Sequence, residues 1–184
     1  MPAETSSLRC RTKRTVFGPI TIIWEATPSF KVKGILLPTH SGDLSVKYPG
    51  IAPSTTEVVE DLADEISEFL EGKDRRLNIR ILDLDSCSLF QRQVLRAECR
   101  VPRGWVSTYG RIARHLGNYN AARAVGKALA TNPFPIVIPC HRAVRSNGEL
   151  GGYQGGEEMK RRLLKMEGVR FSMSGRVLLD KVYY

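Results

Sequence analysis

The balance of charge along the chain changes sharply near residue 85, and this change divides the sequence into two parts. Residues 1–85 contain 11 Lys and Arg against 13 Asp and Glu, whereas residues 86–184 contain 17 against 6. A chain of 184 residues is long enough for two small domains. We therefore expect an N-terminal domain over 1–85 and a C-terminal domain over 86–184. A basic excess confined to one domain favours a polyanionic partner, most often nucleic acid, although solubility alone is the alternative explanation.

Composition and hydropathy limit the class of protein. The chain is 42% hydrophobic and 26% charged, as soluble globular proteins are, which excludes a disordered or fibrous protein. No apolar run approaches the ~20 residues that cross a bilayer. Residues 1–7 are polar and do not resemble a secretory signal. We expect a soluble protein with no membrane partner, in the cytoplasm, or in the nucleus if its source is a eukaryote.

The cysteines and histidines are too scattered to suggest a metal site. The four cysteines stand at positions 10, 87, 99 and 140 without a C-x-x-C pair, and only three histidines accompany them. A structural zinc site or a disulfide framework needs more regular spacing. We expect reduced thiols and no bound metal, and one of the thiols could be reactive.

The first 85 residues alternate between strand-like and helix-like patterns. Ser54 and Glu57 form a capping box ahead of an apolar stripe that Gly72 ends. The acidic face opposite that stripe is typical of a solvated surface. The predicted elements are a basic tail over 1–13, two strands or one strand with a turn within 15–24, interrupted by Gly18-Pro19, a strand over 30–37, a loop over 38–53, a helix over 54–71, and a connector over 73–85 with a short strand at 77–82.

The second part is predicted to be mostly helical. Ser88 and Gln91 form another capping box, and residues 117–120 separate two helical patterns, with Asn120 as the expected N-cap. A helix, a short turn with glycine and a second helix is the helix-turn-helix pattern, although many helix corners share it. The predicted helices cover 88–100, 109–116, 121–130 and 157–167, and a hairpin around Ser174-Gly175 follows within 169–184.

The helix over 121–130 is predicted to have two distinct faces. The core face contains Ala121, Ala124, Val125, Ala128 and Leu129. Beside it, the small residues Ala122, Gly126 and Ala130 lie next to Arg123 and Lys127. Small residues let a helix backbone approach a surface closely, and the cations could hold phosphates or enter between bases. The helix propensity of alanine is a simpler explanation, but glycine within a helix argues against it.

Cys140 is the candidate nucleophile. The apolar run 136–138 ends at Pro139 and places Cys140 beside His141 and Arg142. A thiol needs a base, a cation or a helix N-terminus nearby to react at neutral pH. Adjacent residues seldom point the same way, so we expect a water molecule to link Cys140 and His141. The alternative is a buried structural cysteine in a strand.

A glycine-rich loop, 148–156, follows the candidate nucleophile. It lacks the G-K-[ST] ending of a P-loop, and no strand leads into a G-x-G-x-x-G turn, so a wall over a pocket is favoured over a phosphate cradle. The helix after the loop is predicted to bury Met159, Leu163 and Leu164 and to turn Lys160 towards solvent with its other basic residues.

Five segments of the chain together resemble the O6-alkylguanine-DNA alkyltransferases, also called methylated-DNA–protein-cysteine methyltransferases. The segments are VSTYGRIARHLGN (106–118), AARAVGKAL (121–129), NPFPIVIPCHR (132–142), GGYQGG (151–156) and LLKMEGV (163–169). They occur in the family's order and near its spacing. The resemblance is close from about residue 90 to residue 169 and loose over the first 85 residues.

The resemblance implies an α/β N-terminal domain with a ribonuclease-H-like layout and a mostly α C-terminal domain with a winged helix-turn-helix. It implies a DNA repair protein that transfers a methyl or other alkyl group from O6 of guanine irreversibly to its own cysteine. The target base would be flipped out of the duplex through the minor groove. The partner would be double-stranded DNA containing O6-alkylguanine, bound by a monomer that needs no cofactor and no metal.

The resemblance also implies roles for individual residues. Cys140 matches the alkyl acceptor, and His141 and Glu167 match a water-linked relay that deprotonates it. Tyr109 matches a tyrosine that helps rotate the nucleotide and gives a proton to guanine. Asn132 matches a hinge asparagine that joins the recognition helix to an active-site strand before Cys140. Arg123 matches the finger that fills the gap left by the flipped base, on a DNA-facing helix with Ala122, Gly126, Lys127 and Ala130. The base pocket would include Tyr153, Gln154 and Gly155.

Two positions depart from the family's common pattern. Gln154 stands where many members have a smaller hydroxyl residue, which bears on the size of the O6 adduct that fits, and Ala143 stands where Val is common. The main alternative function is a non-catalytic binder of alkylated DNA lesions, because relatives that lack the acceptor cysteine act in this way. The presence of Cys140 argues against that alternative.

Overall fold

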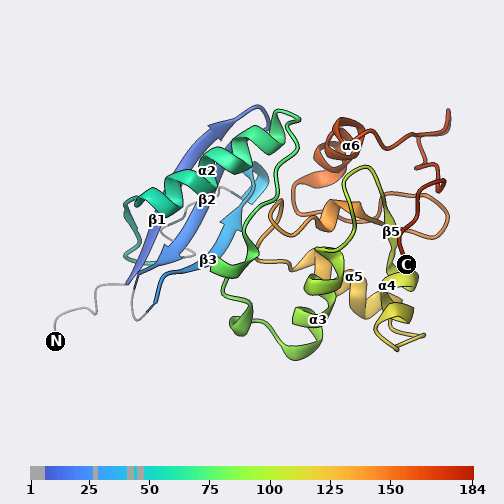
Figure 1. Cartoon of the computed structure of the whole chain (residues 1–184), viewed down its shortest axis with the longest axis horizontal. Coiled ribbons are helices and arrows are strands. Elements are labelled where there is room, and N and C mark those ends of the chain that lie inside the picture. The colour runs from blue at the N-terminus through green and yellow to red at the C-terminus, as the bar shows by residue number, and fades with distance from the viewer. Residues whose placement is uncertain (1–6, 27–28, 41–43, 45–47) are drawn as a thin grey trace. The chain divides into compact units, whose positions relative to one another are not determined.

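The computed structural model describes residues 7–26, 29–40, 44 and 48–184. The chain divides into two compact units, unit 1 (1–83) and unit 2 (84–184) (Figure 1). This boundary lies two residues before the point at which the charge balance changes. Within the described ranges, no helix is long and apolar enough to span a membrane.

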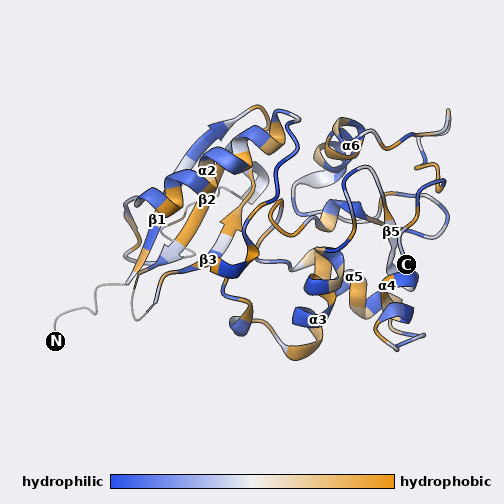
Figure 2. Ribbon diagram, in the orientation of Figure 1, coloured by the Kyte–Doolittle hydropathy of each residue, from blue (hydrophilic) through white to orange (hydrophobic). Residues whose placement is uncertain are grey.

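Unit 1 contains a mixed sheet with a long helix. The strand order among the described residues is β3-β2-β1-β4, in which β1, β2 and β3 are antiparallel and β4 is parallel to β1. Apolar residues dominate β2 and β3, whereas polar residues interrupt them along β1 and α2 (Figure 2). The elements are β1 (Leu8–Thr15), β2 (Gly18–Glu25), β3 (Lys31–Leu36), β4 (Ala52–Pro53) and α2 (Glu57–Leu70), which packs against β1.

Strand β1 contains residues that the charge pattern assigns to a tail. The prediction of a basic tail over 1–13 is wrong for residues 8–13, which pair with β2, and residues 1–6 lie outside the described residues. Two of the basic side chains of β1 pair with acidic residues of α2. Arg11 pairs with Glu60, and Lys13 pairs with Asp64. The sequence of β1 looks like a solvated basic tail because the acidic residues that pair with it lie far away along the chain.

The turn between β1 and β2 lies at Val16 and Phe17. Thr15 pairs with Gly18, so Gly18 begins β2 and does not interrupt a strand as predicted. The φ angle of Gly18 is +106°, a value that glycine adopts readily and other residues rarely do. The glycine is therefore needed directly after the turn. The turn itself lies just before the Gly18-Pro19 pair that indicates it in the sequence.

Helix α2 begins two residues later than its capping box suggests. Thr56 is the N-cap, and its side-chain oxygen accepts a hydrogen bond from the Val59 amide at 3.4 Å. Ser54 is therefore not the cap. The helix ends as predicted, because Gly72 follows with a φ of +97°. The face of α2 turned inward consists of Val59, Leu62, Ala63, Ile66, Phe69 and Leu70.

The connectors form short 3-10 turns. The predicted strand over 77–82 is wrong, because Ile79–Ile81 forms the 3-10 turn η2 and the Asn78 side chain accepts a hydrogen bond from the Arg80 amide. A local side-chain bond of this kind competes with strand pairing. Leu82 makes a single bridge to Val32. Two further 3-10 turns are η1 (Pro38–His40) and η3 (Leu84–Ser86).

Unit 2 is mainly helical, as predicted. Helices α3 and α4 both pack against α5. Ser88 caps α3 as expected, since its hydroxyl oxygen accepts a hydrogen bond from the Gln91 amide at 3.3 Å. The elements are α3 (Leu89–Glu98), β5 (Ser107–Thr108), α4 (Tyr109–His115), α5 (Ala122–Ala130), the 3-10 turn η4 (Cys140–Arg142), β6 (Ala143–Val144), which is parallel to β5, and α6 (Gly156–Met166).

Helices α4 and α5 meet through the short turn that the glycine at 117 predicts. Gly117 has a φ of +76° and ends α4. The predicted N-cap at Asn120 is wrong: Ala121 occupies the cap position, and no side chain caps α5. Residues after α6 return as a small hairpin, in which Phe171 bridges Val177, as the Ser174-Gly175 turn predicts.

Candidate active site

Cys140 follows a tight turn, and the predicted strand over 136–138 is wrong. Ile138 donates its backbone amide to Phe134 at 2.9 Å, and Ile136 has a φ of +73°, which is rare for a β-branched residue. Proline flanks the run on both sides and cannot donate to a sheet. The apolar character of the run therefore reflects burial on all sides, and Cys140 opens η4 instead of extending a strand.

Asn132 holds this turn and contacts the sulfur. Its Nδ2 donates to the Ile138 carbonyl at 3.1 Å and to Cys140 Sγ at 3.2 Å, while its Oδ1 accepts from the Phe134 amide at 2.9 Å. Burial raises the pKa of Cys140 to about 11, and the Asn132 hydrogen bond opposes that rise. At neutral pH, Cys140 is a protonated thiol that needs a base, and Asn132 is placed to stabilise the thiolate once it forms.

A buried His–Glu–Arg cluster lies directly after the cysteine. His141 Nε2 and Glu167 Oε1 are 2.9 Å apart, and Arg142 binds both oxygens of Glu167 through Nε at 2.9 Å and Nη2 at 2.8 Å. Burial disfavours the Glu167 carboxylate, but His141 and Arg142 outweigh burial and lower its pKa to about 2. Burial lowers the pKa of His141, although Glu167 opposes this, so His141 is a neutral base backed by a carboxylate.

Tyr109 and Lys160 support the glycine-rich loop from two sides. A Cβ at Gly151 would lie 2.6 Å from the Tyr109 hydroxyl, so the loop approaches this phenol as closely as only glycine permits. Lys160 Nζ lies 5.9 Å from the centre of the Tyr109 ring and donates to the carbonyls of Leu150 at 2.6 Å and Ala143 at 2.7 Å. The prediction that Lys160 faces solvent is wrong, because its side chain is fully buried.

The residues predicted to line a base pocket lie near the cysteine segment. The Tyr153 hydroxyl is buried and has no hydrogen-bond partner within the described part of the chain, and its ring stands edge-on to His141. Gln154 donates its side-chain amide to the Asn132 carbonyl at 2.6 Å, which ties the loop to the segment that holds Cys140. Gly155 is the N-cap of α6. The structure thus brings the loop and the nucleophile together.

Family membership follows once this geometry is compared with known proteins. A family model described as "6-O-methylguanine DNA methyltransferase, DNA binding domain" matches residues 89–169. The methylated-DNA–protein-cysteine methyltransferase of Shigella flexneri is 40% identical to this chain, over 84% of this chain and 92% of its own length. The chain belongs to this family.

Two further comparisons agree with this family membership. The methylated-DNA–protein-cysteine methyltransferase of Methanothermobacter thermautotrophicus is 45% identical over 60% of this chain, and the match spans 62% of that relative's length. A crystal structure of Mycobacterium tuberculosis OGT in complex with DNA superposes with a TM-score of 0.71 at 29% identity. That superposition covers 87% of this chain and 93% of the mycobacterial chain, so both units follow the family's fold of a mixed sheet with helices.

Helix α5 presents small and basic residues to solvent in this family member. Arg123, Lys127 and Ala130 are exposed, and neither cation pairs with a carboxylate of the described residues. Ala122 and Gly126 are half-buried, and a Cβ at Gly126 would lie 3.9 Å from the Tyr109 ring. Of the predicted core face, Val125, Ala128 and Leu129 are buried, whereas Ala124 is exposed. Helix α5 thus approaches Tyr109 at Gly126 and exposes its two cations to solvent.

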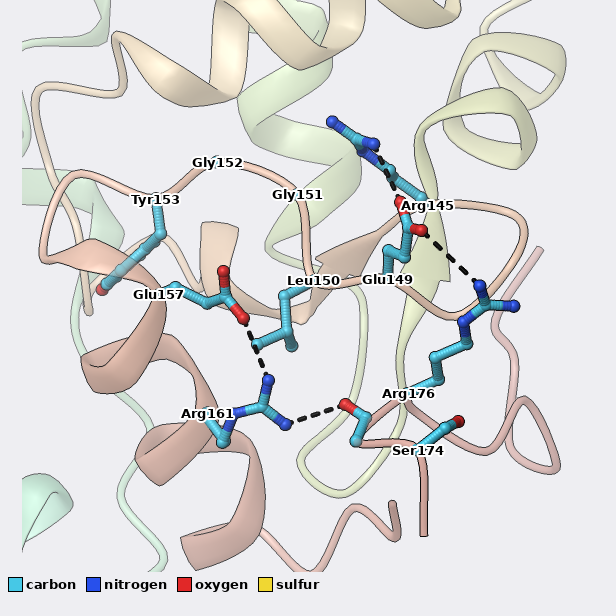
Figure 3. A pocket seen from close by; sticks show the side chains of 11 residues that line it. Arg145, Glu149, Leu150, Gly151, Gly152, Tyr153, Glu157, Arg161, Ser174 and Arg176 are labelled. Atoms are coloured by element: carbon cyan, nitrogen blue, oxygen red, sulfur yellow. Dashed lines mark hydrogen bonds and ion pairs between the residues drawn. The ribbon is translucent and has the colours of Figure 1, made fainter. Parts of the chain in front are cut away.

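A pocket of about 680 Å³ borders the other side of the glycine-rich loop. Figure 3 shows that each arginine lining it reaches a carboxylate or carbonyl oxygen. Arg145 pairs with Glu149 at 2.8 Å, and Arg161 pairs with Glu157 at 3.0 Å and with the Gly175 carbonyl. The two carboxylates of Glu149 and Glu157 therefore offset part of the positive charge of the three arginines that line this pocket.

Two buried charged residues have no role in the sequence-based assignment. Glu98 on α3 is fully buried, and neither of its carboxylate oxygens has a hydrogen-bond partner within the described residues. Lys160 is the second. Both signals exist in the sequence: Glu98 follows Val94 by four residues, and Lys160 precedes Leu164 by four, so each lies on the apolar face of its helix. The charge of Glu98 and Lys160, by contrast, predicts that both side chains face solvent.

Proposed function

We propose that the chain repairs DNA by taking an alkyl group from O6 of guanine onto Cys140, once per molecule. The observation that carries this proposal is the buried thiol, with an amide donor on its sulfur and a neutral imidazole backed by a carboxylate beside it, in a member of this family. A nucleophile next to a base that a third group orients is the general arrangement for nucleophilic catalysis.

The chemistry requires no metal and no redox partner. The thiol proton of Cys140 passes to His141, directly or through water, and Glu167 stabilises the imidazolium that forms. The thiolate attacks the alkyl carbon, the bond from that carbon to O6 breaks, and the electron pair goes to the guanine. Tyr109 gives the departing guanine a proton, and the proton taken up by His141 then restores the phenol, whose pKa burial raises to about 12. The product is a thioether, which water does not readily hydrolyse, so the acceptor is consumed.

The DNA-binding surface is proposed to be the exposed face of α5. Arg123, Lys127 and the small residues between them suit close approach to a minor groove and contact with phosphates. The target atom is inaccessible within a stacked duplex, so the base must be flipped towards Cys140. Arg123 would fill the gap that the base leaves. The relative from M. tuberculosis was crystallised with DNA, which supports the same partner here. We propose that the chain binds it as a monomer.

The finer description of the fold also belongs to this proposal. The parallel placement of β4 beside β1, at the edge of an antiparallel β1–β3 sheet followed by α2, supports a ribonuclease-H-like layout for unit 1. In unit 2, α4 and α5 with the hairpin in 169–184 support a winged helix-turn-helix, in which that hairpin is the wing.

The proposal is tested by the mass of the intact protein after incubation with a duplex that contains one O6-methylguanine. The wild type is expected to gain one methyl group and then stop, and Cys140→Ser is expected to gain none. Cys87→Ser serves as the matched control, because it changes another buried cysteine of unit 2, and it should react as the wild type does. Tight binding of the duplex without any change in mass would instead identify a non-catalytic lesion binder.

A further inference from the structure

The glycine-rich loop has few side chains with which to hold its position. Residues 151–156 contain four glycines, so Tyr153 and Gln154 are the two residues of this segment that have a side chain. Gly151 has a φ of +69° and Gly156 has a φ of +82°, values that glycine adopts at little cost. Because glycine also leaves the backbone unusually free, a loop of this composition keeps a fixed position only when other segments bind it.

The first half of the loop is held from α6 and α4. Lys160 Nζ donates to the Leu150 carbonyl at 2.6 Å and to the Gly152 carbonyl at 3.4 Å. Gly151 lies against the Tyr109 hydroxyl, where a Cβ would come within 2.6 Å. Figure 3 shows this part of the loop as an arch at Gly151 and Gly152. These contacts fix the loop as far as Gly152, and the second half needs its own attachment.

The second half of the loop is attached through Gln154. Its side-chain Nε2 donates to the backbone carbonyl of Asn132 at 2.6 Å, across 22 positions of the sequence. Asn132 is 1% exposed, so its carbonyl needs a hydrogen-bond partner, and the Gln154 amide supplies one. A carbonyl can only accept, so Gln154 must present its NH₂ group to it. An ionised carboxylate of the same shape could not form this bond.

Asn132 connects Gln154 to the sulfur. Its side-chain Nδ2 donates to Cys140 Sγ at 3.2 Å, while its carbonyl accepts from Gln154. Two hydrogen bonds of one buried residue thus join the loop to the nucleophile. Tyr153, the neighbour of Gln154, stands edge-on to His141 with 6.3 Å between the ring centres. The Gln154 bond therefore restricts where the Tyr153 ring can lie relative to Cys140.

We propose that Gln154 is a positioning residue, which fastens the second half of the glycine-rich loop to Asn132 and so holds the Tyr153 ring in a fixed place beside Cys140. In this role the side chain acts through the loop and not on the reacting atoms. The assignment differs from a steric role, in which the length of Gln154 would limit the size of the O6 adduct. Its consequence for alkyl transfer rests on the proposed function, whereas its effect on the loop does not.

The first test measures the loop itself. Gln154→Met keeps the length of the side chain and removes the donor. The Gly156 amide, which donates to the Tyr153 carbonyl at 3.0 Å, should then exchange its hydrogen about twofold to tenfold faster, the range that corresponds to one hydrogen bond. Amides of α3 and of unit 1 should exchange as in the wild type, which shows that the variant is folded. Unchanged exchange at Gly156 would overturn the proposal.

The second test compares two substrates in single-turnover transfer. With Gln154→Met, the maximal rate should fall at least about threefold for a methylated duplex and for free O6-benzylguanine, because the same wall of the base site is displaced in both cases. The half-saturating concentration of duplex should not change, because the exposed face of α5 is intact. Maximal rates equal to those of the wild type would contradict the positioning role. A faster reaction with O6-benzylguanine alone would also contradict it and would assign Gln154 the steric role.

Two further variants make this test specific. Gln93→Met makes the same chemical change at an exposed position of α3, and it should react and exchange as the wild type does. Gln154→Glu keeps the shape but places a carboxylate opposite the Asn132 carbonyl. Its rate relative to the wild type should be low at pH 8 and should recover in part towards pH 5, where a protonated carboxyl can donate. A ratio that stays constant over this range would count against the hydrogen bond.

A measurement on the wild type requires no variant to fold. The side-chain amide of Gln154 should exchange its hydrogen-bonded proton at least about threefold more slowly than the exposed Gln93 does. Equal exchange at the two side chains would sink the inference even if transfer occurs. Absence of transfer in the wild type with both substrates would refute the proposed function and would leave the exchange measurements interpretable.

Discussion

The two units differ in their charged side chains, because among the described residues only unit 2 buries a set of them. In unit 1 the ion pairs lie at the surface, where Arg11 meets Glu60 and Lys13 meets Asp64 between β1 and α2. In unit 2 a larger set of charges is buried around η4, including Glu167 and Lys160. Surface pairs contribute little to stability and are screened by salt, whereas buried charges are costly unless every partner is present. Under the proposed function, the buried charges of unit 2 are retained for chemistry.

The largest effect is expected where a buried charge loses its partner. Glu167→Gln leaves Arg142 buried without a full counter-charge and removes the carboxylate behind His141. Stability should fall by about 3–5 kcal/mol, and alkyl transfer should slow by about 10²-fold or more. Denaturant unfolding and single-turnover transfer measure the two effects. A rate equal to that of the wild type would remove Glu167 from the relay.

The same carboxylate predicts a pH dependence of stability. The pKa of Glu167 is about 2 in the folded protein and lies near 4.3 in an unfolded chain. Its contribution is therefore complete above about pH 5 and is lost as the pH falls towards 2. Glu167→Gln should lack this acid-sensitive part, so the difference in unfolding free energy between the two proteins should shrink below pH 4. A constant difference from pH 7 to pH 3 would contradict the assignment.

An intermediate effect, confined to function, is expected on the exposed face of unit 2. Arg123→Ala removes a solvent-exposed cation and should leave stability within about 0.5 kcal/mol of the wild type. Repair of a methylated duplex should slow by at least about tenfold, while reaction with free O6-benzylguanine should not change, because the free base needs no flipping. Lys127→Ala is the control for a simple phosphate contact and should mainly alter the salt dependence of binding. Equal losses with both substrates would refute the role of Arg123 as a finger.

The smallest effect is expected in unit 1. Glu60→Gln breaks a half-exposed surface pair with Arg11 and should change the thermal midpoint by no more than the error of measurement at moderate salt. Transfer to Cys140 should be unaltered. A clear loss of stability here would mean that the surface pairs of unit 1 are stronger than their exposure suggests, and the contrast between the units would weaken.

The sequence predicts the start of a helix well only when the competing caps are few. Ser88 caps α3 as predicted, but Thr56 replaces Ser54 at the start of α2, because two threonines follow that serine and each could serve as a cap. The apolar run 136–138 also suggests a strand, but the residues that follow it form the 3-10 turn η4. Complete burial produces the same apolar pattern in a strand and in a tight turn, and only the flanking prolines hint at the difference.

The candidate site was accessible from the sequence to the extent that it depends on local motifs. Cys140, His141, Asn132 and Glu167 lie within segments that resemble the family, and the structure brings these four together in one buried cluster. Their roles in the reaction remain predictions. Glu98 and Lys160 escaped this approach, because helical periodicity places them inside whereas their charge suggests an exposed position.

The sequence by itself determined the family, the nucleophile segment, the order of the helices in unit 2 and the concentration of positive charge there. These properties depend on residues that are neighbours along the chain. Only the tertiary structure decided which charges are buried and which partner each one has. A charged side chain becomes stable inside a protein only when distant segments bring counter-charges and hydrogen-bond acceptors to it, as β6 and the glycine-rich loop do for Lys160 and as η4 does for Glu167.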